Sequence, residues 1–201
     1  MNFDLRKYVL TILLTALIWV MALTPLGYIP LFGVDITLMC IPVILGTCVL
    51  GIHHGFFLGL MFAMTSLFMA LMGRAGALLE PVSTSSLSMY VTIFVPRLLI
   101  PITTWFTLKI TAKWNTVLSY CFSVLAGSLT NTVFFLGFVF AFDANLLSGG
   151  HNMTVEVLLI ELLEIASSNG LLEAAVAVVI CVPLSIVFRR ILDKHADILE
   201  G

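Results

Sequence analysis

Six apolar segments separated by short polar stretches account for most of the 201-residue chain. A helix needs about 20 apolar residues to cross the hydrocarbon core of a bilayer, and all but the second segment reach or approach that length. We therefore predict an all-α membrane protein with one integral-membrane domain, residues 1–201. Its six transmembrane helices are expected at Tyr8–Leu23, Thr37–Leu50, Gly55–Met72, Ser88–Thr111, Thr116–Ala141 and Val155–Arg190.

Prolines and glycines divide these helices from one another. The prolines and glycines of residues 25–35 predict an extracytoplasmic loop, and residues 51–55, GIHHG, predict a tight turn. Pro42 is expected to interrupt the second helix. In the third helix, small residues at four-residue spacing predict close packing against a neighbouring helix; they are Gly55, Gly59 and Ala63.

Composition excludes several classes of protein. The chain is 61% hydrophobic and only 10% charged, whereas a soluble domain carries about 25% charged residues. No basic run indicates nucleic-acid binding. The four cysteines are scattered and form no Cys-x-x-Cys pair, so we expect them to pack as small apolar residues without a metal or a cofactor.

The distribution of basic residues predicts the orientation. With six spans and a cytoplasmic N-terminus, seven of the nine basic residues lie at cytoplasmic ends; they are Arg6, Lys7, Lys109, Lys113, Arg189, Arg190 and Lys194. Cytoplasmic loops carry an excess of lysine and arginine, so both termini and the 112–115 turn are predicted to be cytoplasmic. The 73–87 and 142–154 loops are then outside.

The fourth helix carries a charge where the bilayer makes it costly. Arg97 lies between Pro96 and Pro101, and an arginine at that depth costs about 2.5–3.5 kcal/mol on insertion scales. Each proline lacks an N–H, so the carbonyls of Thr92 and Arg97 lose their helical donors. Arg97 is then either a structural cation paired with an acid inside the bundle or part of a ligand site.

Other polar residues fall near the same depth and suggest an outward-facing pocket between the last three helices. Counting residues along each span places Arg97 about 10 Å and Asn131 about 8 Å inside the outer boundary. Arg97 suits a carboxylate or phosphate, and Asn131 offers donors and an acceptor, unless it only bonds a neighbouring helix. Glu164 either pairs with Arg97 or lies solvated at the mouth. The candidate substrate-binding residues are Arg97, Asn131, Tyr90, Ser128, Glu164, Ser168 and Asn169.

No catalytic motif accompanies this pocket. The chain has no nucleotide-binding motif, no His-Glu-x-x-His zinc helix and no Gly-x-Ser-x-Gly elbow. It is therefore not expected to be an enzyme, nor to hydrolyse ATP by itself.

The chain resembles the substrate-binding S components of energy-coupling-factor vitamin transporters over nearly its whole length. The resemblance rests on its size, its six predicted helices, and five segments: PLGYIP at 25–30, DITLMCIPVILG at 35–46, LG at 50–51, GFFLG at 55–59 and NGLLE at 169–173. It implies a multi-pass protein of the bacterial plasma membrane that binds a vitamin near the outer face. It also implies one membrane coupling subunit and two ATPase subunits as partners.

The resemblance also implies where the coupling subunit binds. Members of the family usually carry an Ala-x-x-x-Ala pattern on the first helix, whereas this chain has Thr11 and Thr15 at that spacing, followed by Ala16. Among the vitamins, Arg97 with Asn131 looks most like the pantothenate-specific members. The alternative function is a membrane scaffold protein that binds no ligand, and an intramembrane enzyme is a third candidate.

Overall fold

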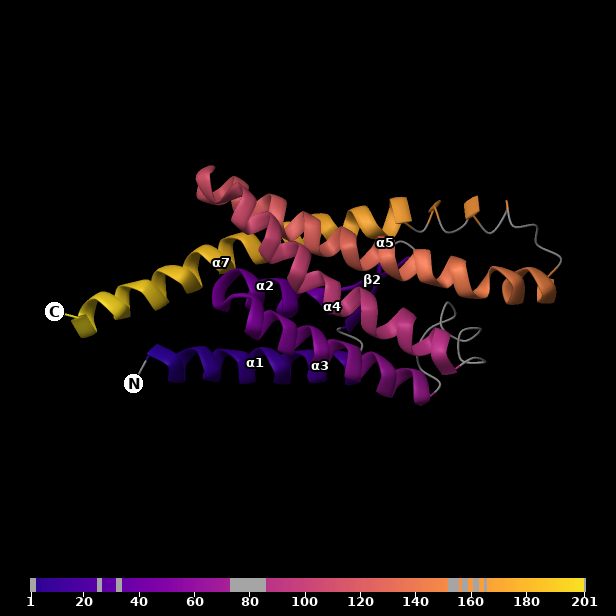
Figure 1. Ribbon diagram of the computed structural model, residues 1–201, viewed down its shortest axis with the longest axis horizontal. Helices are drawn as coiled ribbons and strands as arrows, with labels where there is room; N and C mark the ends of the chain where they lie inside the picture. Colours follow the sequence, from indigo (N-terminus) through magenta and orange to yellow (C-terminus); the bar gives the residue numbers. More distant parts are fainter. Residues whose placement is uncertain are drawn as a thin grey trace.

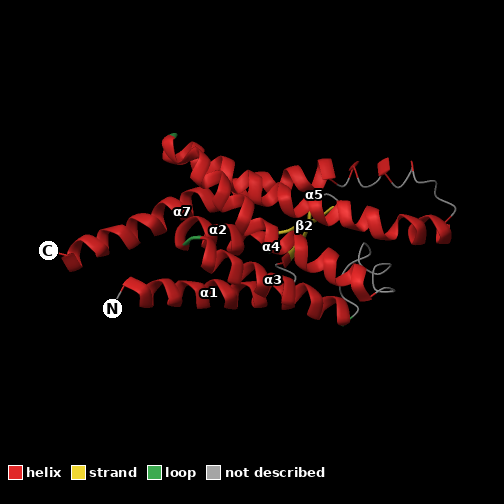
Figure 2. Ribbon diagram, in the orientation of Figure 1, coloured by secondary structure: helices red, strands yellow, loops and turns green. Residues whose placement is uncertain are grey.

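The computed structural model describes residues 3–24, 27–31, 34–72, 86–151, 156, 159–160, 163–164 and 166–200. Helices form most of this part of the chain (Figures 1 and 2). The α-helices are α1 (Phe3–Leu23), α2 (Cys40–Leu50), α3 (Ile52–Leu71), α4 (Ser86–Ile110), α5 (Thr116–His151) and α7 (Leu171–Glu200). The shorter elements are strands β1 (Tyr28–Leu31) and β2 (Val34–Thr37), the 3₁₀-helix η3 (Thr111–Lys113) and the π-helix η4 (Ala166–Gly170).

Five helices in the described part of the chain are long and apolar enough to cross a membrane. These spans are Leu5–Leu23, Ile52–Leu71, Leu87–Lys113, Thr116–Phe142 and Ala166–Leu192. The remaining apolar helix, α2, has only 11 residues and is about 17 Å long. A bilayer core is about 30 Å thick, so α2 alone does not cross it, and the count of six spans stays a prediction.

Both ends of the chain lie at the same end of the bundle. Figure 1 shows the two termini on the left and the junction of α4 with α5 at the upper left. This is the arrangement that the distribution of basic residues requires. Which side of the membrane that end faces stays a prediction.

The short helix α2 occupies the centre of the bundle. Ten of its 11 residues are buried, and it contacts α1, α3, α4, α5 and α7. The largest fully buried side chains of the core include Ile44 of α2, packed with residues of the surrounding helices: Ile18, Phe62, Ile100 and Tyr120. A helix that is apolar on every face is well suited to such an enclosed position.

The boundaries of α2 differ from those expected. The helix begins at Cys40, so Pro42 lies in its first turn and does not interrupt it. The N–H groups of a first turn have no partner within the helix, so a proline there costs no hydrogen bond. One residue, Gly51, separates α2 from α3, and its φ of 94° is a conformation that glycine adopts without strain. The predicted turn at 51–55 is therefore mostly helical.

A β-hairpin stands where an extracytoplasmic loop was predicted. Strands β1 and β2 are antiparallel, with Tyr28 opposite Thr37 and Leu31 opposite Val34. Strand β2 contacts both η4 and α7, and Figure 2 shows the strands in yellow among the helices. The hairpin, which follows α1 in the chain, thus packs against the segment that precedes the last helix and against that helix itself.

The two longest helical predictions were wrong in their boundaries. Helix α5 continues ten residues beyond the predicted end at Ala141, to His151. The predicted sixth helix, Val155–Arg190, contains the π-helical turn 166–170, after which α7 runs to Glu200. The predicted outer loop at 73–87 lies mostly outside the described residues.

Labelling experiments will decide the orientation. We expect a cysteine at Ser85, just before α4, to react with a membrane-impermeant maleimide on intact cells. A cysteine at Asn115, between η3 and α5, should react only after permeabilisation. The four native cysteines are first replaced by serine or alanine. Labelling of Asn115 but not Ser85 on intact cells would reverse the orientation.

Candidate functional site

Arg97 is buried in the bundle and bonds to its own helix. Only 7% of its surface is exposed, and its Nη1 donates a hydrogen bond to the Thr92 carbonyl oxygen at 2.9 Å. This is the carbonyl that loses its helical donor because residue 96 is a proline. The arginine side chain therefore replaces the missing backbone donor.

Two phenylalanines contact the guanidinium of Arg97. Its Cζ lies 5.3 Å from the ring centroid of Phe62 in α3 and 4.8 Å from that of Phe135 in α5. A cation within about 6 Å of an aromatic ring is attracted to the negative face of the ring, more strongly when water is excluded. Two aromatic side chains, from α3 and α5, and a backbone carbonyl of α4 therefore fix the position of the charge. Neither phenylalanine was among the residues predicted to form the site.

The backbone of α4 at Arg97 lies directly against α3. A Cβ atom added to Gly59 would stand 2.7 Å from the Arg97 carbonyl oxygen. That carbonyl has lost its own helical donor to Pro101. The predicted stripe of small residues on α3 thus packs where α4 carries its arginine, as Gly55, on the same face, also lies against Pro101.

Replacing Gly59 with alanine is expected to destabilise the protein by about 1–3 kcal/mol, because the new methyl group meets backbone that cannot rotate away. Gly137 of α5 is the matched control, since an added Cβ there meets no heavy atom within 4 Å. Gly137→Ala should leave the free energy of unfolding unchanged or raise it by up to about 1 kcal/mol. Thermal unfolding of the two variants in detergent measures the difference. Equal melting temperatures would contradict the close contact.

Several buried polar atoms around Arg97 have no hydrogen-bond partner among the described residues. They include the hydroxyls of Ser66 and Thr92 and the Oδ1 atom of Asn131. The Ser128 hydroxyl, on α5 near Asn131, instead bonds to the side chain of Cys40 in α2. Ser66 lies one helical turn from Phe62, and Asn131 one turn from Phe135, so both share a face with a ring that contacts Arg97. A buried polar group without a partner costs about 1–3 kcal/mol. Such a cluster is unusual in a stable core, so these residues are candidates for contact with a polar ligand.

The segment before α7 brings further predicted site residues to α5. A Cβ added to Gly170 of η4 would stand 2.9 Å from Cγ2 of Thr132, the residue after Asn131. Within this segment the Ser168 hydroxyl lies 2.7 Å from the Glu164 carbonyl oxygen and 3.1 Å from Oδ1 of Asn169. The side chain of Glu164 is exposed, and those of Ser168 and Asn169 are half-buried.

Tyr90 lies apart from this arrangement. Nearly half of its surface is exposed, and its ring packs on Phe94 of the same helix at a centroid distance of 6.4 Å. The substrate-binding role predicted for Tyr90 stays a prediction.

The residues predicted to contact a coupling subunit differ in their accessibility. Thr11 is buried, and its hydroxyl lies 2.8 Å from Nδ1 of His54 in α3. Thr15 is half-buried and donates a hydrogen bond to the Thr11 carbonyl oxygen at 2.8 Å. Ala16 is exposed. In this conformation a partner helix reaches Ala16 and the edge of Thr15 more readily than Thr11.

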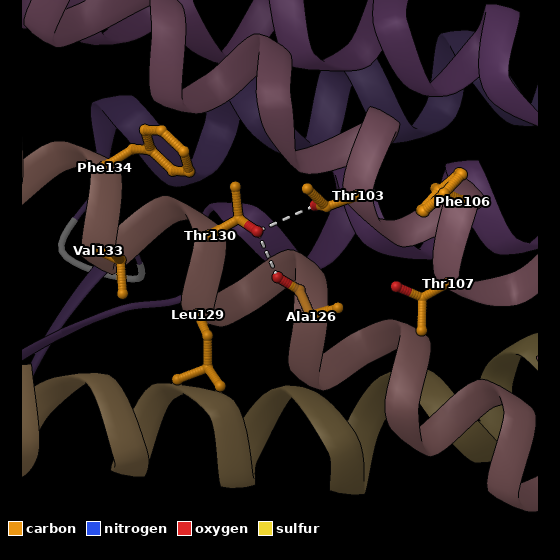
Figure 3. Close-up of a pocket in the computed structure, with 8 residues that line it drawn as sticks. All are labelled: Thr103, Phe106, Thr107, Ala126, Leu129, Thr130, Val133 and Phe134. Carbon is orange, nitrogen blue, oxygen red and sulfur yellow. Dashed lines mark hydrogen bonds between the residues drawn. The ribbon is translucent and has the colours of Figure 1, made fainter. Parts of the chain in front are cut away.

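A separate groove of about 340 Å³ lies between α4 and α5 (Figure 3). Across it the Thr130 hydroxyl lies 3.0 Å from Thr103 Oγ1, and within α5 it lies 2.6 Å from the Ala126 carbonyl oxygen. Its other described walls are mainly apolar, and none of the predicted substrate-binding residues lines it. The groove is therefore unsuited to an anionic ligand.

Comparison with known proteins agrees with this architecture. The family model described as ECF transporter, substrate-specific component matches residues 6–185, which is most of the chain. The chain belongs to this family. No match was found among curated proteins.

Family membership fixes the general function. The chain is a membrane substrate-binding subunit of an ECF importer and not an enzyme. It associates with an ECF module of coupling and ATPase subunits and takes a small-molecule substrate. The sequence left open an alternative function, that of a membrane scaffold protein that binds no ligand. That is not the function of this family. The matched range includes Arg97, Asn131, Ser168 and Asn169.

Proposed function

We propose that the protein binds a small anionic vitamin, with pantothenate as the best candidate, and that Arg97 holds its carboxylate. The observation that carries this proposal is the buried guanidinium with unpaired polar oxygens on the neighbouring helix faces. A guanidinium has five N–H groups in a planar fork that matches a carboxylate. A bond of this type in a desolvated pocket contributes about 1.5–3 kcal/mol.

The neighbouring polar groups suit the rest of the molecule. Pantothenate has one carboxylate, one amide and two hydroxyls, so it needs both donors and acceptors beyond Arg97. The Oδ1 atom of Asn131 accepts a hydrogen bond from a hydroxyl or an amide N–H, and the Ser128 hydroxyl, which also bonds to Cys40, offers a second polar contact on the same helix. Ser168 and Asn169 would add polar groups on the outer side from η4, whose Gly170 lies against Thr132.

The same proposal places the protein in the bacterial plasma membrane with its pocket toward the outside. The β-hairpin and η4 would cover the pocket, since β2 contacts η4 and η4 contacts α5. The Thr11, Thr15 and Ala16 face of α1 would contact the coupling subunit.

A ligand screen tests the proposed substrate. The purified protein is heated in detergent with single water-soluble vitamins, and we expect pantothenate to raise its melting temperature. A ligand present at 100 times its dissociation constant adds about 2.7 kcal/mol to the free energy of unfolding. The alcohol analogue of pantothenate, which lacks the carboxylate, is the matched control and should stabilise little. Equal stabilisation by both compounds would remove the carboxylate from the recognition.

A further inference from the structure

A second cavity, distinct from the proposed vitamin site, opens at the end of the bundle that holds both termini. Its volume is about 490 Å³, and it lies between α4, η3, α5 and α7. The described residues that line it are Leu108, Ala112, Trp114, Thr116, Val117, Ser119, Tyr120, Ile186, Arg189 and Arg190. None of them belongs to the site around Arg97.

The cavity is cationic. Arg189 and Arg190 line it, and none of its described lining residues is acidic. Nη1 of Arg189 donates a hydrogen bond to the Tyr120 hydroxyl at 3.3 Å, and Tyr120 is almost completely buried. This contact holds one of the two guanidiniums against the cavity wall, and both arginines are exposed.

Hydrogen bonds also fix the wall formed by η3 and the start of α5. The hydroxyls of Thr111 and Ser119 lie 2.8 Å apart in a buried contact. Oδ1 of Asn115 accepts a hydrogen bond from the Val117 N–H at 2.9 Å. These bonds fix η3 and the start of α5, so the shape of this wall does not depend on one flexible side chain.

The surroundings place the cavity at the boundary between hydrocarbon and water. Leu108 and Ile186 line its inner part and belong to membrane spans. The indole of Trp114 is exposed and packs edge-on against Phe122, with ring centroids 5.4 Å apart. Tryptophan is enriched at membrane interfaces, where its ring lies at the level of the lipid headgroups. The two arginines thus stand at headgroup depth above an apolar floor.

We propose that this cavity binds the headgroup phosphate of an anionic phospholipid. Basic pockets between transmembrane helices bind such headgroups, and each arginine near a charged membrane surface contributes about 1 kcal/mol. Arg189 and Arg190 hold the phosphate, the Thr116 and Ser119 hydroxyls lie beside it, and Leu108 and Ile186 accept the glycerol and the first part of an acyl chain. The apolar floor favours a lipid over free phosphate. This inference is independent of the vitamin substrate.

Native mass spectrometry of the full chain, released from detergent with added phosphatidylglycerol or phosphatidylcholine, tests the proposal. We expect the wild type to retain phosphatidylglycerol in preference to phosphatidylcholine. Arg190→Gln should weaken this retention about fivefold, which corresponds to about 1 kcal/mol. The double variant Arg189→Gln/Arg190→Gln should weaken it about 25-fold. Ala112→Phe, at an exposed position of the wall, should block the cavity without changing its charge.

Lys109→Gln is the matched control. It also removes one exposed cation near this end of α4, but Lys109 stacks on Trp105 at 4.1 Å and does not line the cavity. It should retain phosphatidylglycerol as the wild type does, and Arg190→Gln should bind the vitamin normally. The proposal is overturned if Arg190→Gln and Ala112→Phe both retain the lipid fully. It is equally overturned if excess inorganic phosphate displaces the lipid, because the cavity would then be a general anion site.

Discussion

Replacing Arg97 with alanine is expected to weaken binding of the carboxylate vitamin by about 10- to 150-fold. A hydrogen bond to a charged group contributes about 1.5–3 kcal/mol. Each factor of ten in affinity corresponds to about 1.4 kcal/mol, which gives the expected loss. Isothermal titration calorimetry on the purified protein measures it. Arg97→Lys should recover only part of the affinity, because an ammonium group does not reproduce the planar fork. Asn131→Ala should cost about tenfold at most, as expected for a neutral hydrogen bond.

The structure supplies a control that separates binding from folding. Arg97→Ala also removes the donor to the Thr92 carbonyl oxygen, so the variant loses stability as well as a ligand contact. In the double variant Pro96→Ala/Arg97→Ala, the backbone N–H of residue 96 is restored and can bond to that carbonyl. The double variant should regain stability over Arg97→Ala but still bind the vitamin weakly. If it binds as tightly as the wild type, Arg97 has a structural role only.

A tryptophan in place of Ala16 is expected to reduce vitamin uptake by about tenfold or more while leaving vitamin binding intact. Small residues allow a partner helix to approach closely, and an indole at an exposed position of α1 prevents that approach. Ala16 suits this test better than Thr11, whose buried hydroxyl contacts His54. Uptake of labelled vitamin into cells that contain the ECF module, and calorimetry on the purified variant, measure the two quantities separately.

Val179→Trp is the control for the general effect of placing a large side chain on the outer surface of a membrane helix. Val179 lies on α7 and is 72% exposed, on a helix that we do not assign to the coupling subunit. Its variant should transport normally. A loss of uptake in both variants would indicate a general defect, and normal uptake with Ala16→Trp would place the coupling contact elsewhere.

Much of the helical framework follows from local sequence. Helix α4 was predicted at Ser88–Thr111 and observed at Ser86–Ile110, because its apolar length outweighs two internal prolines. Gly55 and Gly59 were predicted to mark a close helix contact, and both lie against α4. Patterns of this kind depend on residues a few positions apart, so one sequence is enough to find them.

The surroundings of Arg97 could not be predicted in the same way. The sequence indicates that the Thr92 carbonyl loses its donor, but not that the neighbouring arginine replaces it. That outcome depends on Phe62 and Phe135, which come from other helices and are two of 15 phenylalanines in the chain. The residue spacing of a single chain does not distinguish these two rings from the other thirteen.

The boundary errors have physical causes as well. Helix α5 was ended at Ala141 because the polar residues of 142–154 predicted a loop, yet no proline or glycine follows before Gly149. The hairpin was missed because its strands have only four residues each and Pro30 lies in one of them. Proline is depleted in strands and is tolerated mainly at edges, as in this two-stranded sheet.

The enclosed position of α2 has a consequence for how the protein is made. Helix α2 is the second helix to leave the ribosome, but α7, one of its neighbours, begins at Leu171, about 120 residues later. At about 5–20 residues per second, roughly 6–24 s pass between the synthesis of α2 and that of α7, and during this time the face that α7 later covers lacks its partner. Assembly of the core is therefore post-insertional, and a nascent chain arrested before Leu171 should be a preferred substrate for membrane quality-control proteases.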